Sequence, residues 1–110
     1  MAQIGSVTFT GKSGKKYIFD YWDFPGTWDS VPGVYVVAVY NQGTDTITAL
    51  YVGETDDLKE RFLGHHKQRC FDKYHANILC WWLETDYGKR RALELDLING
   101  IKPVCNEPSQ

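Results

Sequence analysis

The sequence predicts an α+β fold, in which a small three-stranded antiparallel central sheet is flanked by helices and preceded by a β-hairpin. Residues 34–40 and 47–52 are apolar runs of strand length, and the turn-forming segment 41–45 joins them. Residues 87–99 carry apolar side chains at helical spacing and end at Gly100, a residue type that favours a helix C-terminus. The expected order of elements is hairpin, strand, strand, helix, strand, helix.

The hairpin is expected at the N-terminus. Residues 6–10 and 17–22 have strand character, and a segment rich in Gly, Lys and Ser separates them. We therefore divide the chain into residues 1–31, the hairpin and its connecting loop, and residues 32–110, the main domain on which the hairpin packs.

A helix and a third strand complete the main domain. Thr55 or Asp56 can cap a helix that runs to about Gln68. Residues 78–83 form a short apolar run, which predicts a buried strand, and the segment between this strand and the helix has no assigned element.

Composition limits the function. The chain has 110 residues, 43% hydrophobic and 15% aromatic, which is enough for one globular domain. Its net charge of -2 argues against binding nucleic acid through bulk charge. Residues 59–91 nevertheless carry eight Lys or Arg (59, 61, 67, 69, 73, 89, 90, 91) against four acids (60, 72, 84, 86), so a local basic face is expected.

The cysteines and the first residues predict a cytoplasmic protein. Three irregularly spaced cysteines and an N-terminus without signal-peptide features favour a reducing compartment, and the apolar runs are too short to span a membrane. Cys70, His75, Cys80 and Cys105 lack the paired spacing of zinc ligands, so free cysteines in the core are the simpler interpretation.

Arg61 and His65 lie four residues apart on the first predicted helix. A helix turns about 100° per residue, so these side chains are about 40° apart at the margin of the Leu58 and Phe62 stripe. Together they can contact one anionic ligand, although a solvated arginine beside a surface histidine fits the same spacing. His66 points away in this phase.

Glu94 interrupts the apolar face of the second predicted helix. Leu97 and Ile98 follow it at helical spacing, whereas Asp96 points outward. A buried carboxylate needs a partner, which is either a divalent metal ion or an arginine, Arg61 or Arg90.

The sequence alone does not decide the roles of one asparagine and two glycines. Asn106, in the tail after Pro103, either caps nearby backbone or braces the groups around Glu94. Gly33 and Gly53, at the outer ends of the two central strands, leave backbone that a phosphate group can approach.

These residues together resemble the GIY-YIG endonuclease superfamily. The resemblance covers about residues 32–107. It is carried by Gly33-Val34-Tyr35, Tyr51-Val52-Gly53, Arg61, His65, and Glu94 twelve residues before Asn106. The stretch 51–61 is also similar to the nuclease domain of the bacterial excision-repair incision subunit, and the resemblance implies a small stand-alone member. Val34 replaces the isoleucine of the family name.

The resemblance implies metal-dependent hydrolysis of DNA phosphodiester bonds in repair, recombination or mobile-element processing. Glu94 would hold one Mg²⁺ or Mn²⁺, Arg61 would stabilise the phosphoryl oxygens, and Asn106 would brace the site. Tyr35, with its pKa lowered by the cations, would activate water beside Tyr51, and His65 would assist. Gly53, Arg61 and His75, which lies near a histidine used by some members, are expected to contact DNA.

The substrate and the partners are less determined. Branched or flapped DNA is the expected substrate, RNA stays open, and a partner protein is a candidate for targeting. The alternative function is a nucleic-acid-binding module that keeps the nuclease fold but depends on a partner for targeting or cleavage. A third alternative is a protein-interaction domain in which Glu94 is only ion-paired.

Overall fold

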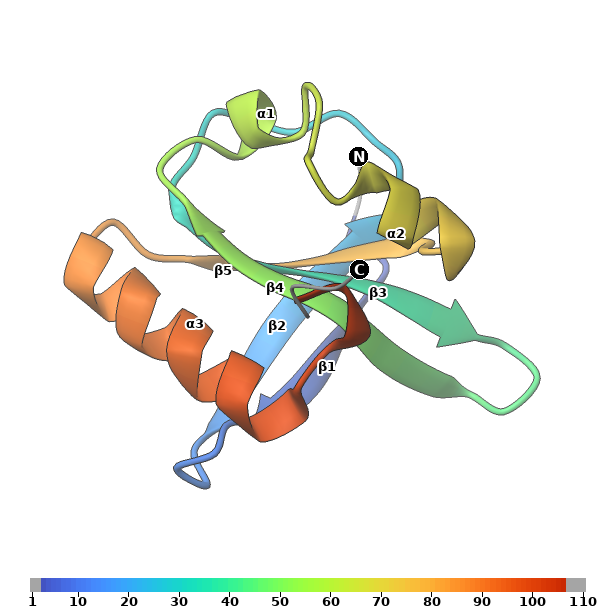
Figure 1. Ribbon diagram of the computed structural model, residues 1–110, viewed down its shortest axis with the longest axis horizontal. Helices are drawn as coiled ribbons and strands as arrows, with labels where there is room; N and C mark the ends of the chain where they lie inside the picture. The colour runs from blue at the N-terminus through green and yellow to red at the C-terminus, as the bar shows by residue number, and fades with distance from the viewer. Residues whose placement is uncertain (1–2, 107–110) are drawn as a thin grey trace.

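A computed structural model describes residues 3–106 and shows one five-stranded antiparallel sheet, curled between helices on its two faces (Figure 1). The strand order is β1-β2-β5-β3-β4. The strands are β1 (Gly5–Thr10), β2 (Lys16–Asp23), β3 (Gly33–Asn41), β4 (Thr46–Thr55) and β5 (Ile78–Leu83). The α+β class is confirmed, but the prediction of a three-stranded sheet is wrong.

The two extra strands are those of the predicted hairpin. β2 pairs antiparallel with β5, with Trp22 opposite Leu79, so the hairpin satisfies the backbone groups along one edge of β5. β5 in turn pairs with β3, with Trp81 opposite Tyr35. The N-terminal segment therefore extends the sheet of the main domain.

Helices cover both faces of the sheet. α1 (Leu58–Arg61) and α2 (Gln68–Lys73) lie on one face and α3 (Tyr87–Ile101) on the other (Figure 1). A 3-10 turn, η1 (Val104–Asn106), returns the chain to β4. β3 is buried from Gly33 to Ala38 because both faces are covered, as its continuous apolar run predicts. Each face has its own hydrophobic core.

The helix expected from Thr55 or Asp56 to Gln68 is interrupted. Asp57 caps α1, its carboxylate accepting from the backbone N–H of Glu60, and the helix ends at Arg61. Gly64 follows with φ 152°, a backbone conformation that side chains disfavour, and it turns the chain away. His65 is therefore outside the helix, and its predicted helical alignment with Arg61 is wrong.

A β-bulge in β4 decides where Tyr51 points. Tyr51 pairs with Val37 but Ala49 pairs with Ala38, so Leu50 is the extra residue in β4. Side chains in a strand alternate between faces, and an extra residue shifts that alternation. Leu50 and Tyr51 consequently both pack in the core under α1 and α2, the core that contains Tyr35.

α3 holds the tip of the hairpin. Asp96, which was expected to point outward, is partly exposed and contacts the hairpin. Its carboxylate accepts from the Ser13 backbone N–H (2.8 Å) and hydroxyl (2.7 Å) and from the Tyr17 hydroxyl (2.8 Å). Gly100 is inside α3, where a Cβ would meet the Lys12 backbone nitrogen at 2.5 Å. The helix ends instead at Ile101 and is capped by Lys102, whose φ of 54° is left-handed.

The cysteines also differ from expectation. Cys70 in α2 and Cys105 in η1 form a disulfide across 35 residues, and only Cys80 is a buried free thiol among the described residues. Disulfides are typical of oxidising compartments, so this pairing weakens the interpretation on which a cytoplasmic location rested. Within residues 3–106 no helix is long and apolar enough to cross a membrane.

Candidate active site

A groove beside α1 contains several of the residues that the sequence singled out. It encloses about 300 Å³. Arg61, at the end of α1, and His65, after the Gly64 turn, both line it, and Tyr35 and Tyr51 lie behind His65 in the sheet. The lining residues are Thr55, Asp56, Asp57, Glu60, Arg61, Gly64, His65 and His66.

Tyr35, Tyr51 and His65 form one aromatic cluster. The Tyr35 hydroxyl lies 2.6 Å from the Nε2 atom of His65, and the Tyr51 and His65 ring centres are 5.1 Å apart. Tyr35 is fully buried, whereas Tyr51 is half-buried. Phe62 and Phe71 pack on the histidine ring at 5.1 and 4.9 Å between ring centres.

The direction of the hydrogen bonds in this cluster follows from His65. The backbone N–H of Lys67 donates to His65 Nδ1 at 3.0 Å, so Nδ1 carries a lone pair. In a neutral imidazole the proton is then on Nε2, which donates to the Tyr35 hydroxyl oxygen. Burial, together with the charges of His66 and Arg61, lowers the His65 pKa from 6.5 to about 4, which keeps the ring neutral near pH 7.

Tyr35 consequently keeps its proton. Burial raises its pKa, with Tyr51 adding to the rise and the charge of Arg61 only partly opposing it. Arg61 lowers this pKa, as expected of a nearby cation, but desolvation outweighs its charge. The side-chain interaction between the two tyrosines raises the Tyr35 pKa and lowers that of Tyr51, although burial still raises the Tyr51 pKa overall.

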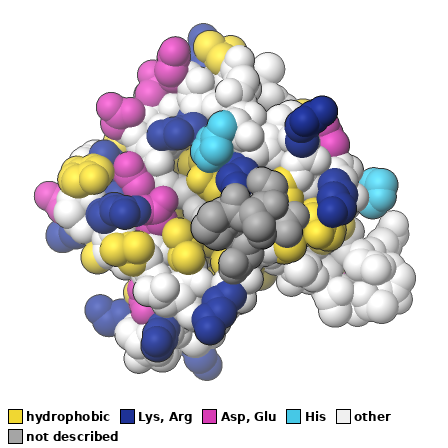
Figure 2. All heavy atoms as spheres, viewed as in Figure 1, with side chains coloured by type: hydrophobic (Ala, Val, Ile, Leu, Met, Phe, Trp, Pro, Cys, Tyr) yellow, Lys and Arg dark blue, Asp and Glu magenta, His cyan; other side chains and the backbone are white. Residues whose placement is uncertain are grey.

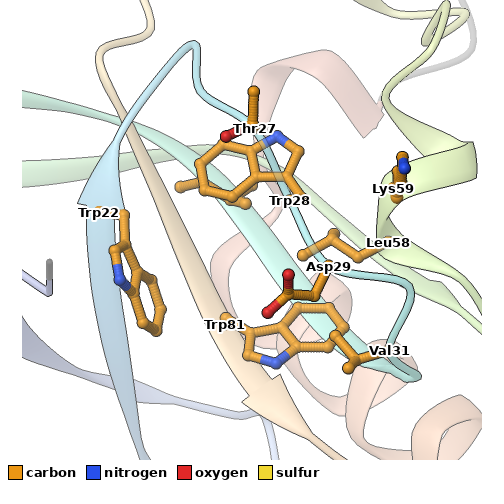
Figure 3. Close-up of a pocket in the computed structure, with 9 residues that line it drawn as sticks. Trp22, Thr27, Trp28, Asp29, Val31, Leu58, Lys59 and Trp81 are labelled. Atoms are coloured by element: carbon orange, nitrogen blue, oxygen red, sulfur yellow. The ribbon is translucent and has the colours of Figure 1, made fainter. Parts of the chain in front are cut away.

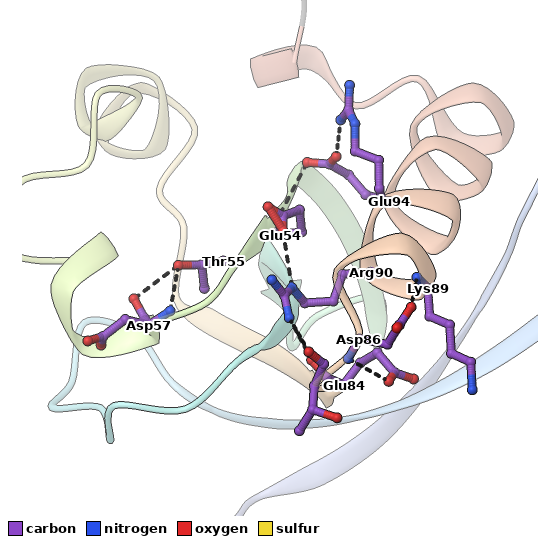
Figure 4. A network of polar contacts seen from close by, with 10 residues as sticks. Glu54, Thr55, Asp57, Glu84, Asp86, Lys89, Arg90 and Glu94 are labelled. Carbon is purple, nitrogen blue, oxygen red and sulfur yellow. Dashed lines mark hydrogen bonds and ion pairs between the residues drawn. The ribbon is translucent and has the colours of Figure 1, made fainter.

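Glu94 lies at the other side of this region, on the buried side of α3. Its Oε2 accepts from the Glu54 backbone N–H at 3.1 Å, and its Oε1 forms an ion pair with Arg91 (Figure 4). Only 8% of Glu94 is exposed, whereas Arg91 is half-exposed. The negative charge of Glu94 raises the pKa of both Tyr35 and Tyr51, which places the carboxylate within electrostatic reach of the tyrosines.

The ion-pair partners expected for Glu94 are not the observed one. Arg90 is committed to Glu54, with 3.2 Å between Nε and Oε2, and to the carbonyl oxygen of Thr85 at 2.8 Å (Figure 4). Arg61 is in the groove. Arg91, which the sequence analysis did not consider, was detectable from its position three residues before Glu94 on the same helix.

Glu94 fits a site with a single protein carboxylate. Mg²⁺ is commonly bound through one or two carboxylates and keeps several waters. One Glu94 oxygen is fixed by the β4 backbone, and the other contacts a half-exposed arginine that can move into solvent. Among residues 3–106 no group of three His, Cys, Asp or Glu is arranged around one point, so water and phosphate oxygens would have to complete the coordination.

The remaining predicted residues divide into two kinds. Asn106 binds backbone, because its side chain accepts from the Val52 N–H (2.8 Å) and donates to the Val52 carbonyl (2.9 Å), next to Tyr51. Gly53 is not an open approach for phosphate, since a Cβ there would meet the Tyr35 hydroxyl at 2.5 Å. His75 follows α2 with a left-handed φ of 61° and does not line the groove.

The charge around the groove is mixed. Basic side chains are dispersed over the face in Figure 2, and acidic ones gather where α1 and the first turns of α3 lie. The acids lining the groove, Asp56, Asp57 and Glu60, are residues that the sequence analysis did not select. They limit the strength with which this face attracts a polyanion.

Comparison with known proteins adds no assignment. No family model, curated protein or solved structure matches the chain.

Proposed function

We propose that the protein is a divalent-metal-dependent endonuclease that hydrolyses DNA phosphodiester bonds, as the resemblance to GIY-YIG nucleases implies. The observation that carries the proposal is the convergence of residues from four parts of the chain. Arg61 and His65 line one groove, Tyr35 and Tyr51 contact His65 from behind it, and the charge of Glu94 raises the pKa of both tyrosines. Structural needs alone do not require two tyrosines, a neutral histidine and a buried carboxylate together.

Each side chain has a distinct task in this proposal. Arg61, which is exposed to solvent, binds the phosphoryl oxygens and stabilises the charge that develops on them. His65 donates to Tyr35, and the Tyr51 ring packs against both of them, so the histidine and Tyr35 hold the Tyr51 ring in place. Asn106 fixes the backbone of β4 beside Tyr51.

Tyr51 replaces Tyr35 as the residue that handles the proton of the attacking water. The water oxygen bonds to phosphorus as the bond to the leaving oxygen breaks, and the water proton passes to the Tyr51 oxygen while Tyr51 gives its own hydrogen to a phosphoryl oxygen. This exchange needs no phenolate, which suits a tyrosine with a raised pKa. A divalent ion held by Glu94 would stabilise the charge on the leaving oxygen.

A binding module without cleavage is the second candidate. The observation that favours it is the ion pair between Arg91 and Glu94, which occupies the carboxylate that a metal would need. Under this alternative the groove binds DNA but needs a partner protein for targeting or cleavage. With a net charge of -2, a targeting partner and a branched or flapped substrate are also part of the leading proposal, and a cytoplasmic setting remains a proposal.

Cleavage assays separate the two functions. Supercoiled, branched and flapped DNA, with RNA versions of the branched substrates, are incubated with Mg²⁺, Mn²⁺ or a chelator, using the native chain and the variants Arg61→Ala and Glu94→Ala. Metal-dependent cutting that falls at least about 100-fold in both variants supports the nuclease. A native protein that cuts none of them but binds DNA with a steep salt dependence establishes the binding module instead. Lys16→Ala, on an exposed part of β2, is the matched control.

A further inference from the structure

A second cavity lies on the opposite side of α1 from the groove. It encloses about 500 Å³ between β2, β5 and the segment before β3, and Leu58 and Lys59 of α1 form part of its wall (Figure 3). We call it the tryptophan cleft, after three of its lining residues. They are Trp22, Thr27, Trp28, Asp29, Val31, Leu58, Lys59, Leu79 and Trp81.

Three indole rings bound the tryptophan cleft. Trp22 stands on one side of the space, and Trp28 and Trp81 stand on the other (Figure 3). Gly33 gives Trp81 its position, because a Cβ at Gly33 would meet the Trp81 ring at 2.7 Å. Trp28 packs edge-on against Phe62, with 6.4 Å between ring centres. All three tryptophans are half-buried, so each ring presents a part of its surface to a ligand.

Two charged side chains accompany the indoles. The Asp29 carboxylate projects between Trp28 and Trp81 toward the space, and Lys59 stands at the rim (Figure 3). Within residues 3–106 neither side chain has a hydrogen-bond or ion-pair partner. Both are exposed, so neither charge is needed to satisfy the fold.

The tryptophan cleft is attached to the helix that carries Arg61. The Lys59 backbone N–H donates to the Asp29 carbonyl at 3.2 Å, and the Leu58 N–H donates to the Val31 carbonyl at 3.0 Å. The wall of the cleft and the start of α1 are therefore one hydrogen-bonded unit. A strand that crosses α1 can contact Arg61 on one side and Lys59 on the other.

We propose that the tryptophan cleft binds an unpaired guanine of a nucleic-acid strand, a proposal that rests on the proposed function for the presence of a strand in the neighbouring groove. The base stacks on the indoles, as unpaired bases do on aromatic side chains. The Asp29 carboxylate accepts from the guanine N1–H and amino group, and the Lys59 ammonium contacts the phosphate of the same nucleotide.

The charges select guanine over other ligands. A carboxylate offers only acceptors, and guanine has two adjacent donors on its pairing edge, whereas adenine and cytosine each place one amino donor beside an acceptor nitrogen. An organic cation would also suit three indoles and a carboxylate. Lys59 disfavours that ligand because it adds a positive charge at the rim, and it favours an anionic nucleotide.

Binding is measured with short dye-labelled oligothymidylates that contain one central guanine, one central hypoxanthine, which lacks the 2-amino group, or thymine only. A chelator is present, so cleavage does not enter, and the guanosine monophosphate nucleotide alone and the corresponding RNA strand distinguish the source of the base. We expect the native chain to bind the guanine strand about tenfold more tightly than the thymine strand, with hypoxanthine between them.

Variants of the lining residues test whether the preference for guanine comes from the tryptophan cleft. Asp29→Asn is expected to remove the preference for guanine, while Asp23→Asn, at an exposed position of β2, retains it. Trp28→Ala is expected to weaken guanine-strand binding about tenfold, and Trp22→Ala is the second variant if Trp28→Ala does not fold. Lys59→Gln is expected to reduce the salt dependence by about one phosphate contact, unlike Lys16→Gln.

The outcomes separate this inference from the nuclease proposal. Equal binding of guanine and thymine strands, or a guanine preference that survives Asp29→Asn, overturns the cleft assignment even if the protein cuts DNA. Tighter binding of a trimethylated ammonium compound than of the guanine strand overturns it in favour of a cation site. A guanine preference that depends on Asp29 supports the cleft even if the protein cuts nothing.

Discussion

The buried polar side chains on the two sides of the groove differ in charge and in the partners that they contact. On the side of α1 and α2, His65, Tyr35 and Tyr51 are neutral, and His65 is hydrogen-bonded to the Lys67 backbone and to the Tyr35 hydroxyl. On the side of α3, Glu94 is charged and is matched by Arg91, a partner that is half in solvent. The neutral side is fixed by packing, whereas the charged side depends on a contact that solvent and other cations can replace.

This difference suggests that the neutral side orients the Tyr51 hydroxyl and that the charged side exchanges the ion-pair partner of Glu94. A neutral network in a closed cluster has one arrangement of protons, so it positions the Tyr51 hydroxyl at little electrostatic cost. A carboxylate paired with an exposed arginine can change partners, because such ion pairs contribute little stability. We expect substitutions on the neutral side to affect stability and rate together, and those on the charged side to affect the response to metal.

The largest expected effect is on the rate of DNA cleavage, when the Tyr51 hydroxyl is removed from the neutral side. Tyr51→Phe should lower single-turnover DNA cleavage roughly 100-fold or more, because no group remains to pass the water proton. Its melting temperature should change little, since the Tyr51 ring stays in place. Tyr21→Phe, on β2, is the control. Unchanged cleavage by Tyr51→Phe would show that the network does not end at Tyr51.

The next effect is on stability, when the centre of the neutral network is cut. Tyr35→Phe leaves the buried His65 Nε2–H without an acceptor, which should lower the free energy of unfolding by about 1–3 kcal/mol in urea denaturation. The same change at Tyr21 should be close to neutral. Equal stability of Tyr35→Phe and the native chain contradicts the assigned direction of the hydrogen bond.

The pH dependence of folding tests whether His65 is neutral. Its pKa is about 4 in the folded protein and 6.5 ordinarily, so the unfolded chain binds more protons in this interval. Stability is then complete above about pH 6.5 and declines as the pH falls toward about 4. Allowing for partial solvent screening, the decline should be about 1–2 kcal/mol. His65→Gln should remove this slope in thermal melts, and His66→Gln should keep most of it; identical slopes in both would contradict it.

The smallest expected effect concerns the support of the charged side. Asp96 holds the hairpin tip on α3, and hydrogen bonds from Ser13, with a further one from Tyr17, keep its pKa below the ordinary 3.8. Its contribution is therefore present above about pH 4 and is lost as the pH falls further. Asp96→Asn should accelerate hydrogen exchange at the Ser13 amide without changing exchange around His65. Faster exchange at both places would mean that the two sides do not open separately.

The sequence predicted those parts of the structure that depend on local patterns. The strand at 78–83, the start of the last helix at Tyr87 and the central hairpin follow from periodicity and turn residues, and the structure has them where expected. The interruption after Arg61 had a local signal too, in Gly64. The pairing of β2 with β5 had no local signal in the sequence, because tertiary packing determines which strands pair at the edge of a sheet.

The sequence predicted which residues lie near the candidate site better than it predicted their orientations and pKa shifts. Arg61 and His65 do meet, although a turn and not a helix face brings them together. The orientation of Tyr51 depends on the bulge at Leu50, which sequence alternation does not reveal. The direction of the Tyr35 pKa shift could not be obtained either, since it depends on burial in three dimensions.

The central claim is that Glu94 exchanges Arg91 for a divalent ion when the protein cleaves DNA. The most direct measurement is the Mg²⁺ concentration that gives half-maximal cleavage, for the native chain, Arg91→Gln, Glu94→Gln and the exposed control Lys89→Gln. We expect a lower concentration for Arg91→Gln, no change for Lys89→Gln and loss of metal-dependent cleavage in Glu94→Gln. Full metal-dependent cleavage by Glu94→Gln, with the native concentration retained in Arg91→Gln, would contradict it.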